Sequence, residues 1–195
     1  MKRVAELERK TKETQIRACL CIDGDGRCEV TTGIGFFDHM LTLMCVHGRL
    51  DLTVTAEGDI QVDYHHTVED VGLVLGQALS QALGERKGIC RYGYAVIPMD
   101  DALAKVAVDL SNRPYLYVRA PSPMPRQNDF DLSLAKEFLR ALAYKAGMNL
   151  HVEIAYGDNW HHMIEAVFKG LGRALRQAAG LDEGVVGVPS SKGAL

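Results

Sequence analysis

The stretch DYHHTVED at residues 63–70 recurs as DNWHHMIEA at residues 158–166, and this doubled pattern decides the fold. Each copy has two adjacent histidines followed by a glutamate three residues after the second histidine. When residues 65–84 are aligned with residues 161–180, eleven of the twenty positions are identical. Identity at this level indicates an internal duplication, so the chain is predicted to consist of two similar halves.

The order of predicted elements is the same in both halves. In the first half, residue periodicity predicts strands between residues 4 and 32 and at residues 50–56, and helices at residues 36–47 and 67–83. A hairpin is predicted at the turn-forming sequence Asp23-Gly24-Asp25-Gly26. In the second half, the same reasoning predicts strands at residues 91–98, 102–109, 115–119 and 149–156, and helices at residues 131–146 and 161–179.

The alignment also pairs His39 in the first predicted helix with Glu137 in the corresponding helix of the second half. Each half therefore carries four candidate metal ligands. They are His39, His65, His66 and Glu69 in the first half, and Glu137, His161, His162 and Glu165 in the second. Residues four apart share a helix face, whereas adjacent residues diverge by about 100°. A histidine and the glutamate four residues later can therefore reach one ion, and adjacent histidines are expected to serve two different ions.

The donor atoms of this set favour a transition metal. Imidazole nitrogen and carboxylate oxygen, without a thiolate, suit Mn, Fe or Zn in a mixed ligand shell. A single histidine pair at a helix start is more often a cap or a packing contact, but a pair that recurs with its glutamate favours metal binding. The HExxH sequence of zinc proteases is absent, which disfavours a metalloprotease.

The composition limits the class of partner. A net charge of -3 provides no field for nucleic acid or for an anionic membrane, and 47% hydrophobic residues can bury a substantial core. No apolar run approaches the roughly 18 residues that a membrane span needs, and the first residues form no signal sequence, so a cytoplasmic location is expected. The five cysteines include no C-x-x-C pair, and they suggest neither a disulfide framework nor a thiolate zinc site.

Three further segments could bind an anion. Arg91 lies at a strand start, Arg113 lies in a turn, and the sequence PSSKG at residues 189–193 combines hydroxyls, backbone amides and a lysine. Such groups can form a phosphate cradle. Taken singly, each is more often an ordinary surface feature, and on the same reasoning Glu13 is a surface carboxylate.

Four motifs together carry a family resemblance. FFDHML at residues 36–41, DYHHTVED, GDNWHHMIEAVFK at residues 157–169, and PSSKG resemble the imidazoleglycerol-phosphate dehydratase family of histidine biosynthesis, in order and from about residue 3 to the last residue. The resemblance implies an α+β fold of the ribosomal protein S5 domain 2-like type, internally duplicated, with a four-stranded sheet and two helices on one face in each half. The expected divisions are residues 1–88, residues 89–180, and a substrate-binding tail at residues 181–195.

The resemblance implies a hydro-lyase that converts D-erythro-imidazole glycerol phosphate to imidazole acetol phosphate with two Mn²⁺ ions per active site. The implied metal ligands are the eight residues above, although many members have histidine in place of Glu137. The implied substrate-binding residues are Glu13, His39, His65, Glu69, Arg91, Arg113, Ser190, Ser191 and Lys192. Arg91, Arg113, Ser191 and Lys192 would hold the phosphate. The family assembly is a shell of twenty-four subunits with active sites where subunits meet, so a homo-oligomer is expected.

The chemistry requires an electron sink, because the hydrogen to be removed lies on a carbon without an adjacent carbonyl. We expect the substrate imidazole to bind both metals as an imidazolate, so that loss of the hydroxyl gives a diazafulvene-like intermediate. A carboxylate then removes the C2 proton, with Glu13, Glu69 and Glu165 as the candidates. A dinuclear metallohydrolase and a metal-dependent assembly module are the alternatives.

Overall fold

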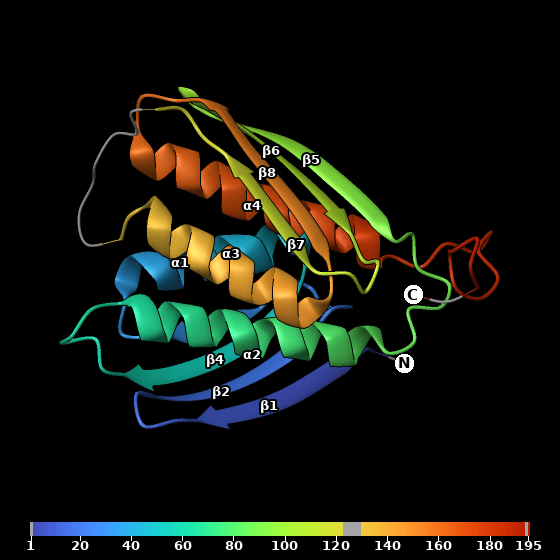
Figure 1. The fold of residues 1–195 in the computed structure, drawn as a ribbon, viewed down its shortest axis with the longest axis horizontal. Helices are drawn as coiled ribbons and strands as arrows, with labels where there is room; N and C mark the ends of the chain where they lie inside the picture. Colours follow the sequence, from blue (N-terminus) through green and yellow to red (C-terminus); the bar gives the residue numbers. More distant parts are fainter. Residues whose placement is uncertain (1, 123–129, 194) are drawn as a thin grey trace.

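The computed structural model describes residues 2–122, 130–193 and 195, which form two α/β halves (Figure 1). The first half consists of β1 (Val4–Lys10), β2 (Thr14–Cys21), β3 (Cys28–Thr31), α1 (Gly35–Gly48), β4 (Asp51–Gly58) and α2 (His65–Leu83). The second consists of β5 (Tyr92–Met99), β6 (Ala102–Asp109), β7 (Tyr115–Arg119), α3 (Leu132–Ala146), β8 (Asn149–Tyr156) and α4 (Trp160–Ala179).

The two sheets have the same topology. Their strand orders are β1-β2-β4-β3 and β5-β6-β8-β7, and in each sheet the last strand is parallel to its neighbour whereas the other pairs are antiparallel. Figure 1 shows the four helices between the two sheets, so each sheet has two helices on one face. The predicted fold class, an internally duplicated α+β fold, is confirmed, and the duplication is visible in the matching strand orders.

The hairpin predicted at residues 23–26 is wrong. β2 and β3 flank this segment but do not pair, because β4 lies between them, and β3 is parallel to β4. The turn residues serve another purpose: Asp51 Oδ1, at the start of β4, accepts the N–H groups of Asp25, Gly26 and Arg27 at 2.8–3.1 Å. The glycine-rich sequence therefore wraps around the start of β4 instead of reversing the chain between paired strands.

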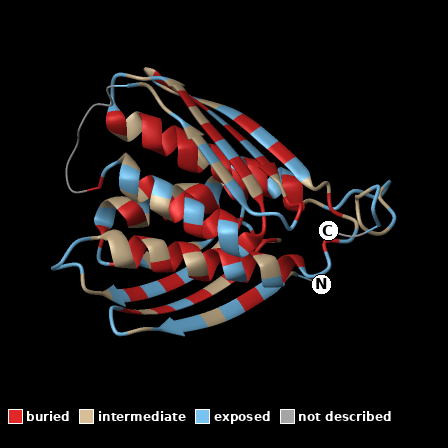
Figure 2. Ribbon diagram, in the orientation of Figure 1, coloured by how far each residue is buried: buried red, intermediate tan, exposed pale blue. Residues whose placement is uncertain are grey.

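The core lies between the sheets, where α1 packs on α4 and α2 packs on α3. Along the strands, buried and exposed residues alternate (Figure 2), as expected for sheets with one covered face. Gly76 and Gly172, identical in the two repeats, allow the helices to approach closely. A Cβ atom added to Gly76 would lie 2.5 Å from the Leu142 carbonyl oxygen, and one on Gly172 would lie 2.1 Å from that of Met44.

This close packing fixes the ends of the helices relative to one another. α2, α3 and α4 all begin at the same end of the molecule, opposite the two chain termini (Figure 1). Phe138 of α3 contacts both Phe37 of α1 and Phe168 of α4, with ring centroids 5.3 and 5.4 Å apart. Among the described residues, no helix is long and apolar enough to cross a membrane.

Candidate functional site

The paired histidines lie in the first turns of α2 and α4. Asp63 accepts the backbone N–H of His65 at 2.8 Å, and the N-cap residue Asn159 accepts that of His161 at 2.9 Å. A side-chain acceptor that binds the free N–H groups of a first turn fixes where a helix starts. As a result α2 begins at His65, two residues before the predicted start, and all four histidines project from helix beginnings at one end of the molecule.

Three predicted ligands meet where α1 contacts α4. His39 Nε2 lies 2.8 Å and His161 Nε2 lies 2.9 Å from the same oxygen, Oε1 of Glu165. One ligand atom from each residue lies within 4.8 Å of the others, a spacing that could hold a metal ion. We call these three residues the α1–α4 cluster. Two nitrogen donors and one carboxylate oxygen are the mixed set that the sequence predicts.

The carboxylate of this cluster is buried and ionised. Glu165 is 6% exposed, and Lys169 Nζ donates to its second oxygen, Oε2, at 2.6 Å. Burial opposes ionisation, but the hydrogen bonds from Lys169, His39 and His161 outweigh it and lower the pKa of Glu165 to about 2. The carboxylate is therefore in its ligand form at neutral pH.

The equivalent residues of the other repeat form a looser group, the α2–α3 cluster of His65, Glu69 and Glu137. His65 Nε2 lies 3.7 Å from Glu69 Oε2. Arg140 lies between the two carboxylates, since it donates to Glu69 at 2.9 Å and to Glu137 at 2.9 Å through Nε. The hydrogen bond to Glu137 raises the pKa of Arg140, so the guanidinium stays charged. Arg140 thus bridges the two carboxylates, and His65 lies beside Glu69.

Adjacent histidines face different partners. The rings of His65 and His66 have centroids 6.0 Å apart and an interplanar angle of 82°, and those of His161 and His162 are 6.3 Å apart at 80°. This agrees with the expectation that neighbours on a helix diverge. The second histidine of each pair contacts a carboxylate outside its own helix.

These outside carboxylates were missed in the sequence analysis. His66 Nδ1 lies 3.0 Å from Asp59 Oδ2, and His162 Nδ1 lies 2.5 Å from Asp101 Oδ1. The hydrogen bond to His162, together with N–H groups of Asn159 and Asp158, lowers the pKa of Asp101 far below its ordinary value. The hydrogen bond to Asp59 raises the pKa of His66. The only sequence signal was an acidic pair, Asp100-Asp101, in a turn.

Glu13 lies beside the first repeat's second histidine. It occupies the β1–β2 turn, and its Oε1 is 3.9 Å from His66 Nε2, with 55% of the side chain exposed. From the residue pattern alone, Glu13 is an ordinary surface carboxylate. The fold places it at the same end as the histidines, because the β1–β2 turn lies next to the start of α2.

The predicted phosphate ligands gather elsewhere. Arg91 donates to Asp109 through Nε at 2.7 Å and to the Pro189 carbonyl at 2.8 Å, which ties the tail to β5. Arg113 Nη2 lies 4.0 Å from Asp109, so the two arginines share one carboxylate. In the tail, Lys192 N–H donates to Ser190 Oγ at 3.2 Å, and Ser191 and Lys192 are exposed.

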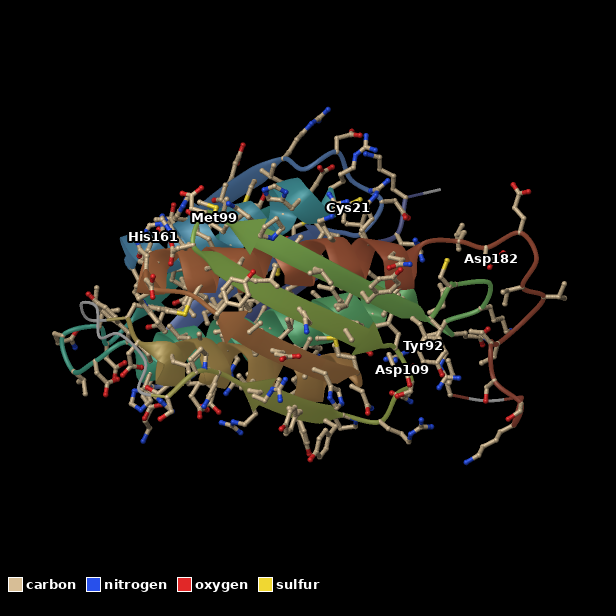
Figure 3. All side chains as sticks on the ribbon, turned by 90° about the horizontal axis from the view of Figure 1, so that it is seen from above. Cys21, Tyr92, Met99, Asp109, His161 and Asp182 are labelled. Carbon is tan, nitrogen blue, oxygen red and sulfur yellow. The ribbon has the colours of Figure 1, made fainter. Side chains whose placement is uncertain are left out.

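The two groups of predicted site residues lie at opposite ends of the chain's fold. Figure 3 shows His161 at one end and Tyr92, Asp109 and Asp182 at the other. Arg91 N–H bonds to the carbonyl of Ala178, in the last turn of α4, whereas His161 lies in its first turn. At 1.5 Å rise per residue, α4 separates them by about 26 Å.

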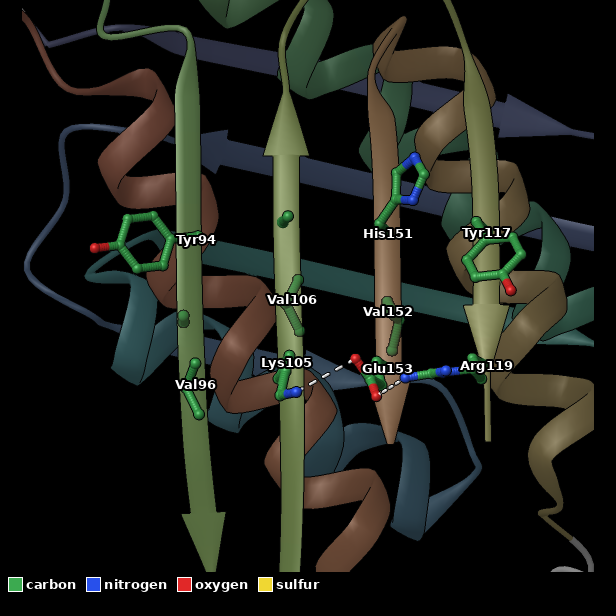
Figure 4. Close-up of a pocket in the computed structure, with 11 residues that line it drawn as sticks. Tyr94, Val96, Lys105, Val106, Tyr117, Arg119, His151, Val152 and Glu153 are labelled. Atoms are coloured by element: carbon green, nitrogen blue, oxygen red, sulfur yellow. Dashed lines mark hydrogen bonds and ion pairs between the residues drawn. The ribbon is translucent and has the colours of Figure 1, made fainter. Parts of the chain in front are cut away.

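A groove on the outer face of the second sheet contains none of these residues. Tyr94, Tyr117, His151 and Glu153 line it (Figure 4), and Glu153 pairs with Lys105 at 3.5 Å. It lies on the face turned away from the helices. The predicted site residues therefore lie at the two ends of the molecule and not in this groove.

Comparison with known proteins gives one consistent result. The family model described as imidazoleglycerol-phosphate dehydratase matches residues 32–175. Proteins of that name from Geobacillus sp. and Desulfosudis oleivorans are 56% and 53% identical over 195 residues, the full length of both chains in each comparison. The crystal structure of the Staphylococcus aureus enzyme has a TM-score of 0.82 at 38% identity and covers 92% of this chain and 99% of its own. The crystal structure of the Pyrococcus furiosus enzyme has a TM-score of 0.85 at 41% identity and covers 97% of this chain and 100% of its own. The chain therefore belongs to the imidazoleglycerol-phosphate dehydratase family.

Proposed function

We propose that this protein is a hydro-lyase of L-histidine biosynthesis that converts D-erythro-imidazole glycerol phosphate to imidazole acetol phosphate. Full-length similarity to dehydratases at 53–56% identity supports the reaction. The observation that carries it is the α1–α4 cluster, where His39 and His161 converge on the buried, ionised Glu165. A cationic end with two arginines and a lysine supplies the counterpart for a phosphate.

We propose two Mn²⁺ ions per active site as the cofactor. The residues fit such ions: imidazole and carboxylate donors match manganese, and three ligand atoms already lie within 4.8 Å of one another. The residues that would hold the ions are the eight predicted from the sequence: His39, His65, His66, Glu69, Glu137, His161, His162 and Glu165. Bound metal ions would supply electron withdrawal at the substrate's imidazole ring. The intermediate expected above stays a prediction.

The site is proposed to form between subunits of a homo-oligomer. We call the end with the paired histidines the histidine end, and the end with Arg91, Arg113 and residues 190–192 the phosphate end. In one chain they are about 26 Å apart by the length of α4, which exceeds the length of the six-carbon phosphorylated substrate. One small molecule cannot reach both ends of the same chain. A second copy that brings its residues 190–192, Arg91 and Arg113 to the first copy's histidines would complete the site.

Residues of this chain then have distinct tasks. Arg91, held by Asp109, and Arg113 would bind the phosphate. Ser190, Ser191 and Lys192 of the tail would contact the same substrate. Glu13 is half exposed, and the nearest described histidine nitrogen, Nε2 of His66, lies 3.9 Å from its carboxylate, so this carboxylate is available to take a proton from the substrate. Glu69 and Glu165 are the other candidates for proton transfer, and Glu165 is the more constrained because three donors hold it.

The reaction is tested by incubating the Mn²⁺-loaded protein with imidazole glycerol phosphate and following the ketone product. We expect the ketone to form, to disappear after chelation, and to return when Mn²⁺ is restored. Release of inorganic phosphate without ketone would instead identify a dinuclear metallohydrolase. If the fully metallated protein assembles but consumes no substrate, the metal serves assembly alone and the proposed reaction is wrong.

A further inference from the structure

The second histidines of the two pairs, His66 and His162, share one hydrogen-bonding arrangement. Each ring presents Nδ1 to a carboxylate, at 3.0 Å for Asp59 and 2.5 Å for Asp101. An ionised carboxylate only accepts hydrogen bonds, so Nδ1 carries the proton in both rings. In a neutral imidazole with a protonated Nδ1, the lone pair that can bind a metal is on Nε2.

The Nε2 atoms face outward towards other acidic groups. His66 Nε2 lies 3.9 Å from Glu13 Oε1, and His162 Nε2 lies 3.7 Å from Asp100 Oδ2. Both distances exceed a hydrogen bond. Nε2 is therefore not hydrogen-bonded to these carboxylates. Both rings lie in first turns of helices at the end of the molecule that carries the other candidate ligands.

Backbone contacts hold the Asp101 carboxylate and the chain segment that carries Asp59. Asp101 Oδ2 accepts the N–H groups of Asp158 at 2.5 Å and Asn159 at 2.7 Å, in the loop that leads into α4. Asp59 donates its own N–H to the Glu13 carbonyl at 3.1 Å, which joins the segment after β4 to the β1–β2 turn. The carboxylate that faces His162 is thus held by backbone groups, whereas the carboxylate that faces His66 is placed through the backbone position of Asp59.

The two carboxylates come from positions that the internal repeat does not relate. Asp59 follows β4, and the residue in the same alignment position after β8 is Gly157, which has no side chain. A Cβ at Gly157 would lie 2.5 Å from Met163 Cγ and 2.9 Å from Ala102 Cβ, so no carboxylate fits there. The second half supplies Asp101 from the β5–β6 turn instead. Reaching one arrangement from two unrelated positions indicates that the arrangement itself is needed.

We propose that Asp59 and Asp101 are positioning residues that hold His66 and His162 with Nδ1 protonated and Nε2 directed at the metal ions. The proposal rests on the metal-dependent function proposed above. Carboxylates that orient metal-binding histidines typically change metal affinity about 10–100-fold when replaced. An asparagine at either position can turn its NH₂ group towards Nδ1, which favours the tautomer with the proton on Nε2 and blocks metal binding.

The test measures Mn²⁺ binding to metal-free protein at a fixed pH by the EPR signal of the free ion, for Asp59→Asn, Asp101→Asn and the double variant. Asp158→Asn is the matched control, because it makes the same substitution in the loop that Asp101 contacts and leaves the N–H that Asp101 accepts. The unfolding midpoint of each metal-free variant is measured alongside, since a residue with only a structural role changes the midpoint and not the number or affinity of metal sites.

We expect Asp59→Asn to lower the Mn²⁺ affinity of the site that His66 serves by about 10–100-fold, and Asp101→Asn to do the same for the site that His162 serves. The double variant should lose affinity at both, and Asp158→Asn should keep the parental affinity. Parental affinities in both Asp59→Asn and Asp101→Asn would overturn the proposal while leaving the metal site intact. If the unchanged protein binds no Mn²⁺, the metal site fails and the positioning role fails with it. Should Asp101→Asn not fold, Asp59→Asn alone decides the outcome.

Discussion

At the scale of single residues, the environments of Glu13 and Glu165 suit them to different tasks. Glu165 is 6% exposed, and Lys169 and two histidines hold it as an anion. Glu13 is half exposed in a turn, 3.9 Å from its nearest histidine nitrogen. A carboxylate held by three donors is suited to bind metal, whereas a carboxylate free to move suits proton transfer.

We therefore expect Glu13→Gln to retain two Mn²⁺ ions per subunit and to lose turnover by at least about 10², the usual scale of general acid–base catalysis. Glu6→Gln, an exposed carboxylate on β1, is the matched control and should keep parental turnover. Metal content by atomic emission and steady-state rates check both variants. Parental turnover in Glu13→Gln would remove Glu13 from the mechanism.

At the scale of elements, Asp51 holds the segment between β2 and β3 in place. Its carboxylate accepts three consecutive backbone N–H groups. The hydrogen bonds from Asp25 and Arg27 lower the pKa of Asp51 below its ordinary value. This loop passes the start of β4, so the chain reaches the side of β4 away from β2, where β3 lies parallel to β4. α1, which carries His39, follows β3, and its position depends on this loop.

A carboxyl group whose pKa is lower in the folded state stabilises the fold above its unfolded pKa of about 3.9, and this stabilisation is lost as the pH falls through the folded pKa. Asp51→Asn should therefore reduce the free energy of unfolding at pH 7 by about 1 kcal/mol, because a neutral acceptor binds N–H groups less strongly. The difference from the parent protein should shrink below about pH 3.9. Urea unfolding at several pH values measures it. A difference that is constant with pH would show that the charge of Asp51 is not the cause.

At the scale of the whole molecule, the arrangement of sheet, helices and sheet separates the paired histidines from the proposed phosphate-binding residues. The helices run the length of the molecule, so the histidines at their starts and the arginines near the C-terminal end of α4 cannot meet within one chain. The internal repeat doubles the end that carries the paired histidines. The tail after α4 belongs to the second half alone.

A complementation experiment tests whether two copies share a site. Glu165→Gln disables the histidine end and Arg113→Ala the phosphate end, so each alone should lose at least about 10² in activity. In mixed assemblies, sites that combine the intact end of each variant should restore up to about a quarter of the parental activity. The assay is turnover of purified mixed assemblies carrying two different tags. Activity no higher than that of the separate variants would indicate a site contained in one chain.

The sequence by itself predicted the duplication and the order of strands and helices, because the repeat and the strand and helix periodicities are local properties. The arrangement of a four-stranded sheet with two helices on one face in each half was implied by the family resemblance. The sequence also identified the histidines and glutamates, since residues four apart on a helix share a face wherever the helix lies. Residue periodicity does not specify strand order, which is why the segment at residues 23–26 resembled a hairpin although β4 lies between β2 and β3.

Contacts between residues far apart in the chain were decided only by the tertiary structure. Asp59 and Asp101 meet their histidines because strand ends and turns converge on the helix starts, and Arg140 lies between Glu69 and Glu137 because α2 packs on α3. The distance between the two ends follows from helix length and direction in the packed molecule. Sequence patterns report geometry along one element, whereas these contacts depend on how several elements pack against one another.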